Sequence, residues 1–120
     1  TLVTKASDKE ATQSQIVKAV ISWKQNGFGD ALYFSRAAVP TGAIEKYHHI
    51  GVYGWRRPAL ANFVKLTPSP LELAEKLEQL RALEAGMRIT VAKIPEAPGG
   101  IDTAEDLEAV RQRLALTQDN

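Results

Sequence analysis

The chain has 120 residues, of which 44% are hydrophobic and 24% are charged, and its formal net charge is +1. This length fits one domain with a real core, and the near-neutral charge gives no electrostatic reason for binding nucleic acid or an anionic membrane. Cysteine is absent, which excludes disulfides, thiolate catalysis and Cys-ligated zinc, and no apolar run approaches the ~20 residues of a membrane helix.

The first residues, 1–4, are β-branched and apolar and predict a short strand. Ser7 and Asp8 are residues that start helices or turns. No apolar segment follows a basic start, so the sequence does not predict a signal peptide. We expect that the chain begins partway through a fold.

A hairpin is predicted next. Residues 16–21 are apolar and rich in β-branched side chains, and residues 31–34 form the return strand. The turn between them contains Asn26-Gly27, a strong hairpin signal.

Residues 50–55 alternate glycine with large side chains, which predicts a strand whose backbone approaches something closely. A short helix is predicted over 58–66, with Pro58 in its first turn. Residues 87–94 alternate again and predict another strand.

The segment 68–86 predicts one helix. Ser69 and Glu72 can form a capping box, with Pro70 at the first helical position, and Gly86 is suited to end the helix. At about 100° per residue, one narrow face carries three leucines: Leu73, Leu77 and Leu80. The opposite side carries polar residues that are either solvated or functional: Glu75, Glu78 and Gln79.

A final helix follows Thr103, which can cap it, and has an apolar face of Leu107, Val110 and Leu114. The order of elements is strand, hairpin, strand, two helices, strand and helix. This order predicts an α/β fold in a single domain that covers residues 1–120.

Two polar residues each allow two interpretations. Arg36 follows a predicted strand and is either a surface arginine or a bidentate clamp for a carboxylate or phosphate. Asp102 follows Gly99-Gly100 and is either a residue that favours a turn or a Mg²⁺ ligand.

The adjacent histidines His48 and His49 should point to opposite faces of a strand, so one of them should face solvent. A hydrogen-bonding role for one histidine is therefore favoured over a two-histidine metal site. Tyr53 lies four residues after His49 and should share its face, where it either packs in the core or contacts a ligand.

Four motifs together resemble a known family. They are YFSRAAVP (33–40), HIGVYGWR (49–56), PSPLELAEKLEQLRALEAG (68–86) and GIDTAEDLEAVR (100–111). In this order they are similar to the carboxyl-terminal half of the 3-deoxy-manno-octulosonate cytidylyltransferases. The strand IVKAVIS (16–22) is similar to a strand of the same family.

The resemblance implies a Rossmann-like α/β nucleotidyltransferase with a small dimerisation hairpin subdomain. It implies transfer of CMP from CTP to 3-deoxy-D-manno-octulosonate (Kdo) for lipopolysaccharide synthesis, with Mg²⁺ as cofactor and pyrophosphate as product. The expected partners are these two substrates and a second copy of the chain in a cytoplasmic homodimer, without nucleic acid or membrane.

The resemblance also assigns residues. It implies Kdo contacts for Arg36, His49 and Tyr53, hydrogen bonds to Kdo hydroxyls for Glu78 and Gln79, and a Mg²⁺ ligand for the residue at the Gly-rich turn, Asp102. The family's amino-terminal, CTP-binding half is expected to be absent from this chain, which alone should be inactive. The connection 41–48 is shorter than in many relatives, and Trp55 replaces a common tyrosine.

Two other hypotheses remain open. The chain is a non-catalytic fragment or a dimerisation and binding module, or it belongs to a cytidylyltransferase for a related sugar acid.

Overall fold

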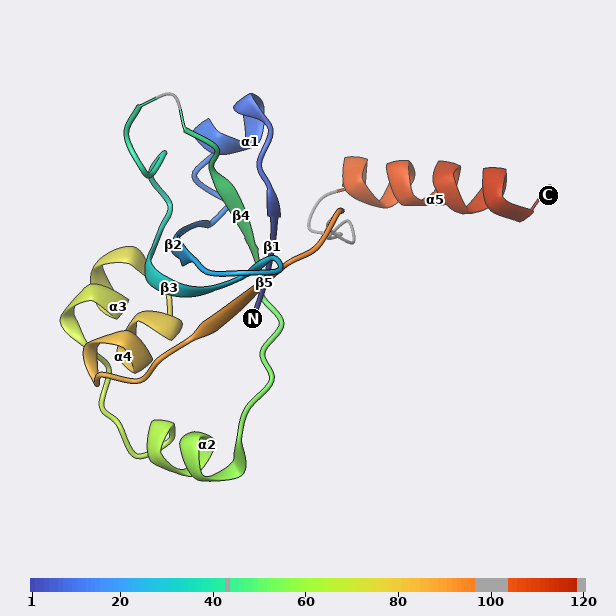
Figure 1. Cartoon of the computed structure of the whole chain (residues 1–120). Coiled ribbons are helices and arrows are strands. Elements are labelled where there is room, and N and C mark those ends of the chain that lie inside the picture. Colours follow the sequence, from blue (N-terminus) through green and yellow to red (C-terminus); the bar gives the residue numbers. More distant parts are fainter. Residues whose placement is uncertain (43, 97–103, 119–120) are drawn as a thin grey trace.

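Five short strands close into a barrel in the computed structural model, which describes residues 1–42, 44–96 and 104–118 (Figure 1). The strands are β1 (Leu2–Lys5), β2 (Lys18–Trp23), β3 (Phe28–Ser35), β4 (Tyr47–Ile50) and β5 (Thr90–Lys93). Their order around the barrel is β1-β4-β2-β3-β5. All neighbours are antiparallel except β1 and β5, which close the barrel in parallel.

The predicted hairpin is confirmed as β2 and β3. Asn26 and Gly27 both adopt left-handed backbone angles, with φ of 57° and 74°, and so reverse the chain. The register of β2 shifts between Val20 and Ile21. Gly29 pairs with Trp23 further along the hairpin. A Cβ on Gly29 would lie 2.7 Å from the Ile21 side chain and from the Ser22 carbonyl oxygen, so only glycine fits there without displacement.

The strand predicted over 50–55 is wrong in its extent, because β4 ends at Ile50. The Val52 N–H donates to the Ile50 carbonyl at 2.7 Å, and this tight turn takes the chain out of the sheet. The predicted close backbone approach is also wrong here, since a Cβ on Gly51 or Gly54 would meet nothing within 4 Å.

Short helices occupy two of the predicted places. α1 (Asp8–Thr12) begins at Ser7, whose hydroxyl and the Glu10 carboxylate form a capping box. α2 (Arg57–Phe63) follows β4 and has Pro58 in its first turn, as predicted.

The single helix predicted over 68–86 is two helices, α3 (Pro70–Glu75) and α4 (Gln79–Glu84). Lys76 adopts a left-handed conformation with φ of 57°, which ends α3 and turns the chain before α4. The predicted leucine face is therefore split: Leu77 and Leu80 are buried, whereas Leu73 is 65% exposed. Half of the predicted capping box is present, since the Ser69 N–H donates to the Glu72 carboxylate at 3.0 Å, whereas the buried Ser69 hydroxyl has no hydrogen-bond partner among the described residues. The left-handed Gly86 after α4 is confirmed.

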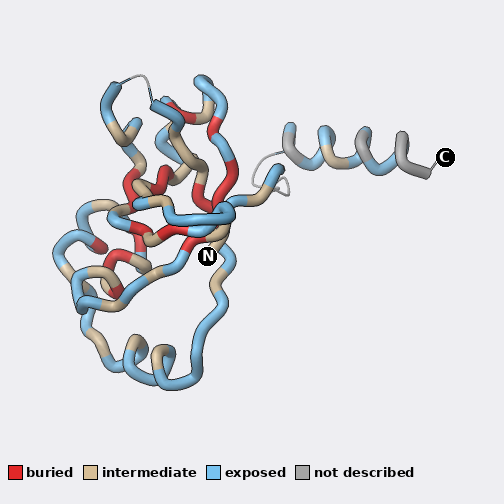
Figure 2. The backbone as a smooth tube through the Cα atoms, viewed as in Figure 1, coloured by how far each residue is buried: buried red, intermediate tan, exposed pale blue. Residues whose placement is uncertain are grey.

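The core lies inside the barrel and under α4 (Figure 2). Its buried side chains come from four strands and from the region of α4: Val3, Ala19, Ala31, Phe34, Leu77, Leu80 and Val91. The fully buried Lys18 joins them, because its ammonium donates to the carbonyls of Gln13, Ile16 and Arg36 at 2.5–2.8 Å.

The last helix, α5 (Ala104–Gln118), stands apart from the barrel in Figure 1. Its apolar Leu107 and Leu114 are 37% and 60% exposed. Within the described ranges, none of the helices combines the length and the apolar character that crossing a membrane requires.

Candidate functional site

His49 and Tyr53 form the centre of the candidate site. His49 comes from the end of β4, and Tyr53 from the irregular segment that follows it. Their ring centroids are 5.5 Å apart, although 51–56 is not a strand. The expected proximity is therefore confirmed, while the strand periodicity used to predict it is not.

The imidazole of His49 is held on two sides. It packs edge-on against Phe34 at 4.8 Å between ring centroids, and its Nε2 lies 2.9 Å from the Thr1 hydroxyl. His49 is 7% exposed, and this burial, aided by the Thr1 ammonium and His48, lowers its pKa to about 4. His49 is therefore neutral near pH 7 and can donate one hydrogen bond and accept another.

Tyr53 is half-buried beside His49. Burial raises the pKa of its phenol, and the negative charge of Glu78 raises it further. Tyr53 is thus protonated and a hydrogen-bond donor at neutral pH. Glu78 itself is exposed at the N-cap position of α4.

His48 and His49 point to different surroundings, as the strand geometry predicts. The expectation that one faces solvent is wrong, because the His48 side chain is only 19% exposed and its Nδ1 lies 3.5 Å from the Glu10 carboxylate of α1. Across the residues that the structure describes, no group of three or more His, Asp or Glu side chains is placed to hold a metal ion.

Arg36 is engaged elsewhere in the fold. Its Nε donates to the Glu75 carbonyl at 3.1 Å and its Nη1 to the Ser14 carbonyl at 3.2 Å. The Glu75 carboxylate in turn accepts from the Arg36 backbone N–H and from the Ser35 hydroxyl. These contacts join the end of β3 to α3, and they do not include His49 or Tyr53.

Glu75 was predicted to be on the polar side of a helix and is part of this network instead. Burial acts to raise the pKa of its carboxyl, but hydrogen bonds from Ser35, Arg36 and Tyr33 outweigh it and lower the pKa. Sequence periodicity missed this role because it placed Glu75 on one continuous helix.

The remaining predicted residues are placed as follows. Gln79 is the first residue of α4, next to Glu78, and is half-buried. Asp102 lies outside the described residues. The structure therefore brings His49 and Tyr53 together, leaves Glu78 exposed at the start of α4, and places Arg36 in a separate network.

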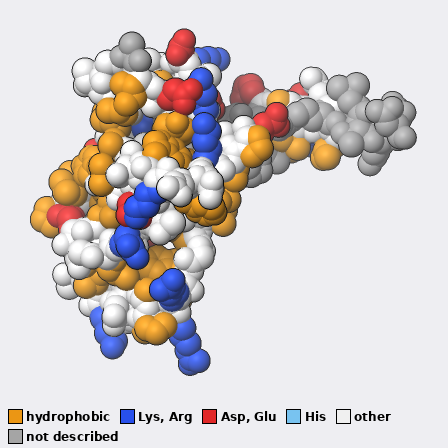
Figure 3. Space-filling view, viewed as in Figure 1, with side chains coloured by type: hydrophobic (Ala, Val, Ile, Leu, Met, Phe, Trp, Pro, Cys, Tyr) orange, Lys and Arg blue, Asp and Glu red, His pale blue; other side chains and the backbone are white. Residues whose placement is uncertain are grey.

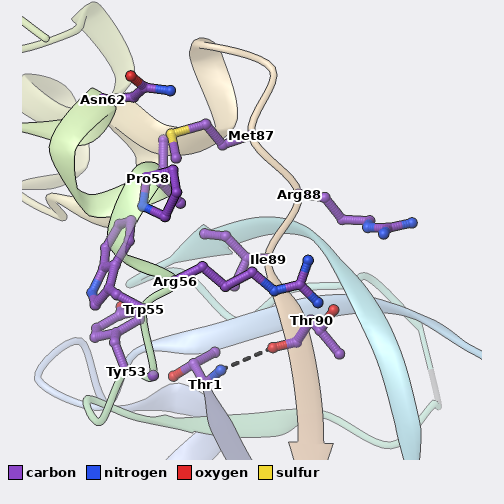
Figure 4. Close-up of a pocket in the computed structure, with 13 residues that line it drawn as sticks. Thr1, Tyr53, Trp55, Arg56, Pro58, Asn62, Met87, Arg88, Ile89 and Thr90 are labelled. Atoms are coloured by element: carbon purple, nitrogen blue, oxygen red, sulfur yellow. Dashed lines mark hydrogen bonds between the residues drawn. The ribbon is translucent and has the colours of Figure 1, made fainter.

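A cavity of about 740 Å³ lies between α2 and the chain leading into β5 (Figure 4). Tyr53 lines it, together with Trp55, Arg56 and the segment 87–90. The dashed line in Figure 4 marks the hydrogen bond from the Thr1 nitrogen to the Thr90 carbonyl, at 2.8 Å, at the edge of this cavity.

A series of aromatic rings, tilted relative to one another, connects Tyr53 to α2. The Tyr53 and Trp55 centroids are 6.3 Å apart, and those of Trp55 and Phe63 are 4.9 Å apart. The Arg81 guanidinium lies 5.0 Å from the Phe63 centroid and pairs with the Glu72 carboxylate. Figure 3 shows basic side chains around this α2 end of the molecule. The sequence signal for this side of the site was the end of HIGVYGWR, where an aromatic residue and Arg56 precede a helix.

Comparison with known proteins gives a consistent result. A family model described as cytidylyltransferase matches residues 1–89. The chain is 56% identical over 108 residues to a protein from Parvibaculum lavamentivorans named 3-deoxy-manno-octulosonate cytidylyltransferase, covering 90% of this chain and 42% of that protein. A protein of the same name from Nitrobacter hamburgensis is 55% identical over 109 residues, covering 91% and 42%.

A solved structure described as CMP:2-keto-3-deoxy-manno-octonic acid synthetase complexed with CTP is also similar. The TM-score is 0.88 at 37% identity, and the match covers 98% of this chain and 48% of that chain. This match and the mixed sheet with helices fit an α/β nucleotidyltransferase fold. The chain spans less than half the length of the relatives it matches.

Proposed function

Because the chain belongs to the cytidylyltransferase family, we propose that it is part of an enzyme that transfers CMP from CTP to Kdo and releases pyrophosphate. The observation that carries the proposal is the 56% identity, over 90% of this chain, to a relative named for this reaction. The solved relative complexed with CTP supports the nucleotide substrate. The sugar acid supplies the attacking hydroxyl, and the α-phosphate of CTP receives it.

The proposed place of this chain in the enzyme is its carboxyl-terminal, sugar-binding half. The β2–β3 hairpin is the proposed dimerisation element of a cytoplasmic homodimer. Exposed apolar side chains on this hairpin, Phe28 at 52% and Leu32 at 60%, support a surface that another molecule covers.

The proposed sugar contacts are Arg36, His49, Tyr53, Glu78 and Gln79. A polyol needs donors and acceptors within reach of one another, and the neighbouring His49, which is neutral, and Tyr53, which is protonated, supply both kinds. Glu78 adds a carboxylate acceptor at the start of α4. Gln79 adds an amide next to Glu78. These residues bind and orient the sugar.

Mg²⁺ is the proposed cofactor, and Asp102 is one proposed ligand. A carboxylate in a Gly-rich segment is suited to Mg²⁺, which takes few protein ligands. When bound, the metal ion would neutralise charge on the triphosphate of CTP. Asp102 lies outside the described residues, so its proposed role rests on the motif resemblance.

Titration calorimetry with Kdo tests the sugar site. Glu78→Gln should weaken Kdo binding by about 10-fold or more, because a carboxylate acceptor for a hydroxyl becomes a neutral amide. Glu84→Gln is the matched control, because it removes a negative charge from the same helix. The affinity of this variant for Kdo should equal that of the unaltered chain. Equal affinity for Glu78→Gln and the unaltered chain would contradict the assignment of Glu78.

An assay of pyrophosphate release from CTP and Kdo tests the reaction. The 120-residue chain should bind Kdo but turn over CTP slowly or not at all, because it spans less than half of the relatives' length. Turnover by this chain near the rate of a full-length relative would show that the proposed division of the enzyme is wrong.

A further inference from the structure

We infer that Glu75 is a positioning residue for sugar binding, because it holds both the backbone and the side chain of Arg36 at the junction of β3 and α3. The inference rests on the proposed function, in which Arg36 contacts the sugar acid, and it adds a residue that acts through Arg36. Glu75 is the last residue of α3, and Arg36 directly follows β3. The contact therefore joins two elements whose residues are 39 positions apart in the chain.

Glu75 holds Arg36 through two different groups. Its carboxylate accepts from the Arg36 backbone N–H at 3.1 Å, and its main-chain carbonyl accepts from the Arg36 Nε at 3.1 Å. The buried ammonium of Lys18 donates to the Arg36 carbonyl at 2.7 Å. The backbone and the side chain of Arg36 are thus fixed relative to the end of α3, and this sets the direction in which the guanidinium leaves β3.

The Glu75 carboxylate is itself held in place. It also accepts from the Ser35 hydroxyl at 2.7 Å and from the Tyr33 hydroxyl at 3.3 Å. Burial acts to raise the pKa of this carboxyl, but the hydrogen bonds lower the pKa overall, so Glu75 is ionised at neutral pH. Glu75 is therefore a fixed and charged anchor for the chain that follows β3.

Arg36 keeps donors for a ligand in this arrangement. A guanidinium has five N–H groups, and the described residues accept from two of them, at Nε and Nη1. With respect to these residues, both terminal nitrogens retain an N–H for the carboxylate or a hydroxyl of the sugar acid. Because the Nε bond already restrains a side chain with many rotamers, less conformational entropy is lost when the sugar binds.

The same link joins the segments that carry the other proposed sugar contacts. Phe34, two residues before Arg36, packs edge-on against His49 at 4.8 Å between ring centroids. Glu78 begins the turn into α4 three residues after Glu75. Glu75 therefore connects the strand end beside His49 to the chain that leads into α4.

Titration calorimetry with Kdo tests the inference through a double-mutant cycle. Glu75→Ala should bind Kdo about 10-fold more weakly, and Arg36→Ala at least as weakly. The double variant should bind no more weakly than Arg36→Ala alone, because Glu75 has no effect on the sugar without the side chain that it positions. Glu75→Gln should have an intermediate affinity, since its amide oxygen can still accept a hydrogen bond.

Urea unfolding of each variant separates binding from stability. Val91→Ala is the control, because Val91 is fully buried in the core and takes no part in the network of Glu75. This variant should be less stable than the unaltered chain and bind Kdo with the same affinity. If Glu75→Ala does not fold, Glu75→Gln and its double variant with Arg36→Ala complete the same cycle.

Three results would overturn the inference. If folded variants of Glu75 bind Kdo as the unaltered chain does, Glu75 only stabilises the junction, and the proposed function stands. If Arg36→Ala leaves the affinity unchanged, or if the two substitutions weaken binding by factors that multiply in the double variant, Glu75 does not act through Arg36. If the unaltered chain does not bind Kdo, the proposed sugar site is wrong, and the inference falls with it.

Discussion

Burial determines the charge of His49, and this has a measurable consequence for stability. The pKa of His49 is lowered from 6.5 to about 4 in the folded chain, first by burial. Between these two pH values the unfolded chain binds more protons at this residue than the folded chain does. Folding stability should therefore be complete above pH 6.5 and fall as the pH is lowered toward 4, by up to about 3 kcal/mol.

Urea unfolding at pH 7.5 and pH 5 measures this effect. The free energy of unfolding of the unaltered chain should be lower at pH 5, and the His49→Gln variant should lose most of that difference. All other titratable groups remain in this variant, so any pH dependence of stability that it keeps comes from those groups. A difference between the two pH values that is unchanged in His49→Gln would assign the acid sensitivity to other groups.

For polar residues, contacts between neighbours in the chain could be predicted from the sequence, whereas contacts between distant residues could not. The proximity of His49 and Tyr53 was predictable because they are close in the chain. The engagement of Arg36 by Glu75 and Ser14 was not, since these partners are 39 and 22 residues away. The acceptors of Arg36 are main-chain carbonyls, which any residue type can supply. The sequence therefore does not distinguish a structural arginine of this kind from a surface arginine.

At the scale of elements, the main correction is the division of 68–86 into α3 and α4. The cap at Ser69 and the end at Gly86 were predictable because each depends on local chemistry. The break was not predictable, because Lys76 is a good helix former that takes a left-handed conformation here. Packing of Leu77 and Leu80 into the core favours the break over helical continuity.

Two leucines of the predicted face test this division. Leu77→Ala should lower the free energy of unfolding by about 2–5 kcal/mol, because Leu77 is 6% exposed and its loss leaves a cavity in the core. Leu73→Ala is the control from the same predicted face, and it should change stability by less than about 1 kcal/mol, since Leu73 is 65% exposed. Urea titration of both variants measures the difference. Similar losses would mean that both leucines pack in one continuous helix.

At the scale of the whole molecule, barrel closure assembles the site from distant segments. Leu2 of β1 pairs with Ala92 of β5, and β4 lies on the other side of β1. This closure places Thr1 beside His49 and next to Thr90. The sequence indicated an α/β order, but strand order and closure depend on pairings between residues about 90 positions apart, which local patterns do not encode.

The contrast between the barrel and α5 leads to a prediction about local stability. The amides of β1 and β5 lie in paired strands around a buried core. α5 has 15 residues and carries exposed apolar side chains at Leu107 and Leu114. Isolated helices of about this length are marginal in water, so tertiary packing is what normally stabilises them. Amides of α5 should therefore exchange by local opening, at a much lower free energy than global unfolding.

Native-state hydrogen exchange, followed by NMR or mass spectrometry, measures this difference in the 120-residue chain. Amides of β1 and β5 should be protected to a free energy close to that of global unfolding, and amides over 104–118 should exchange orders of magnitude faster. A urea concentration that partly unfolds the barrel gives the internal control, because it should change strand protection and leave α5 exchange nearly unchanged. Equal protection of α5 and the strands would show that α5 unfolds with the barrel, as a helix packed on it would.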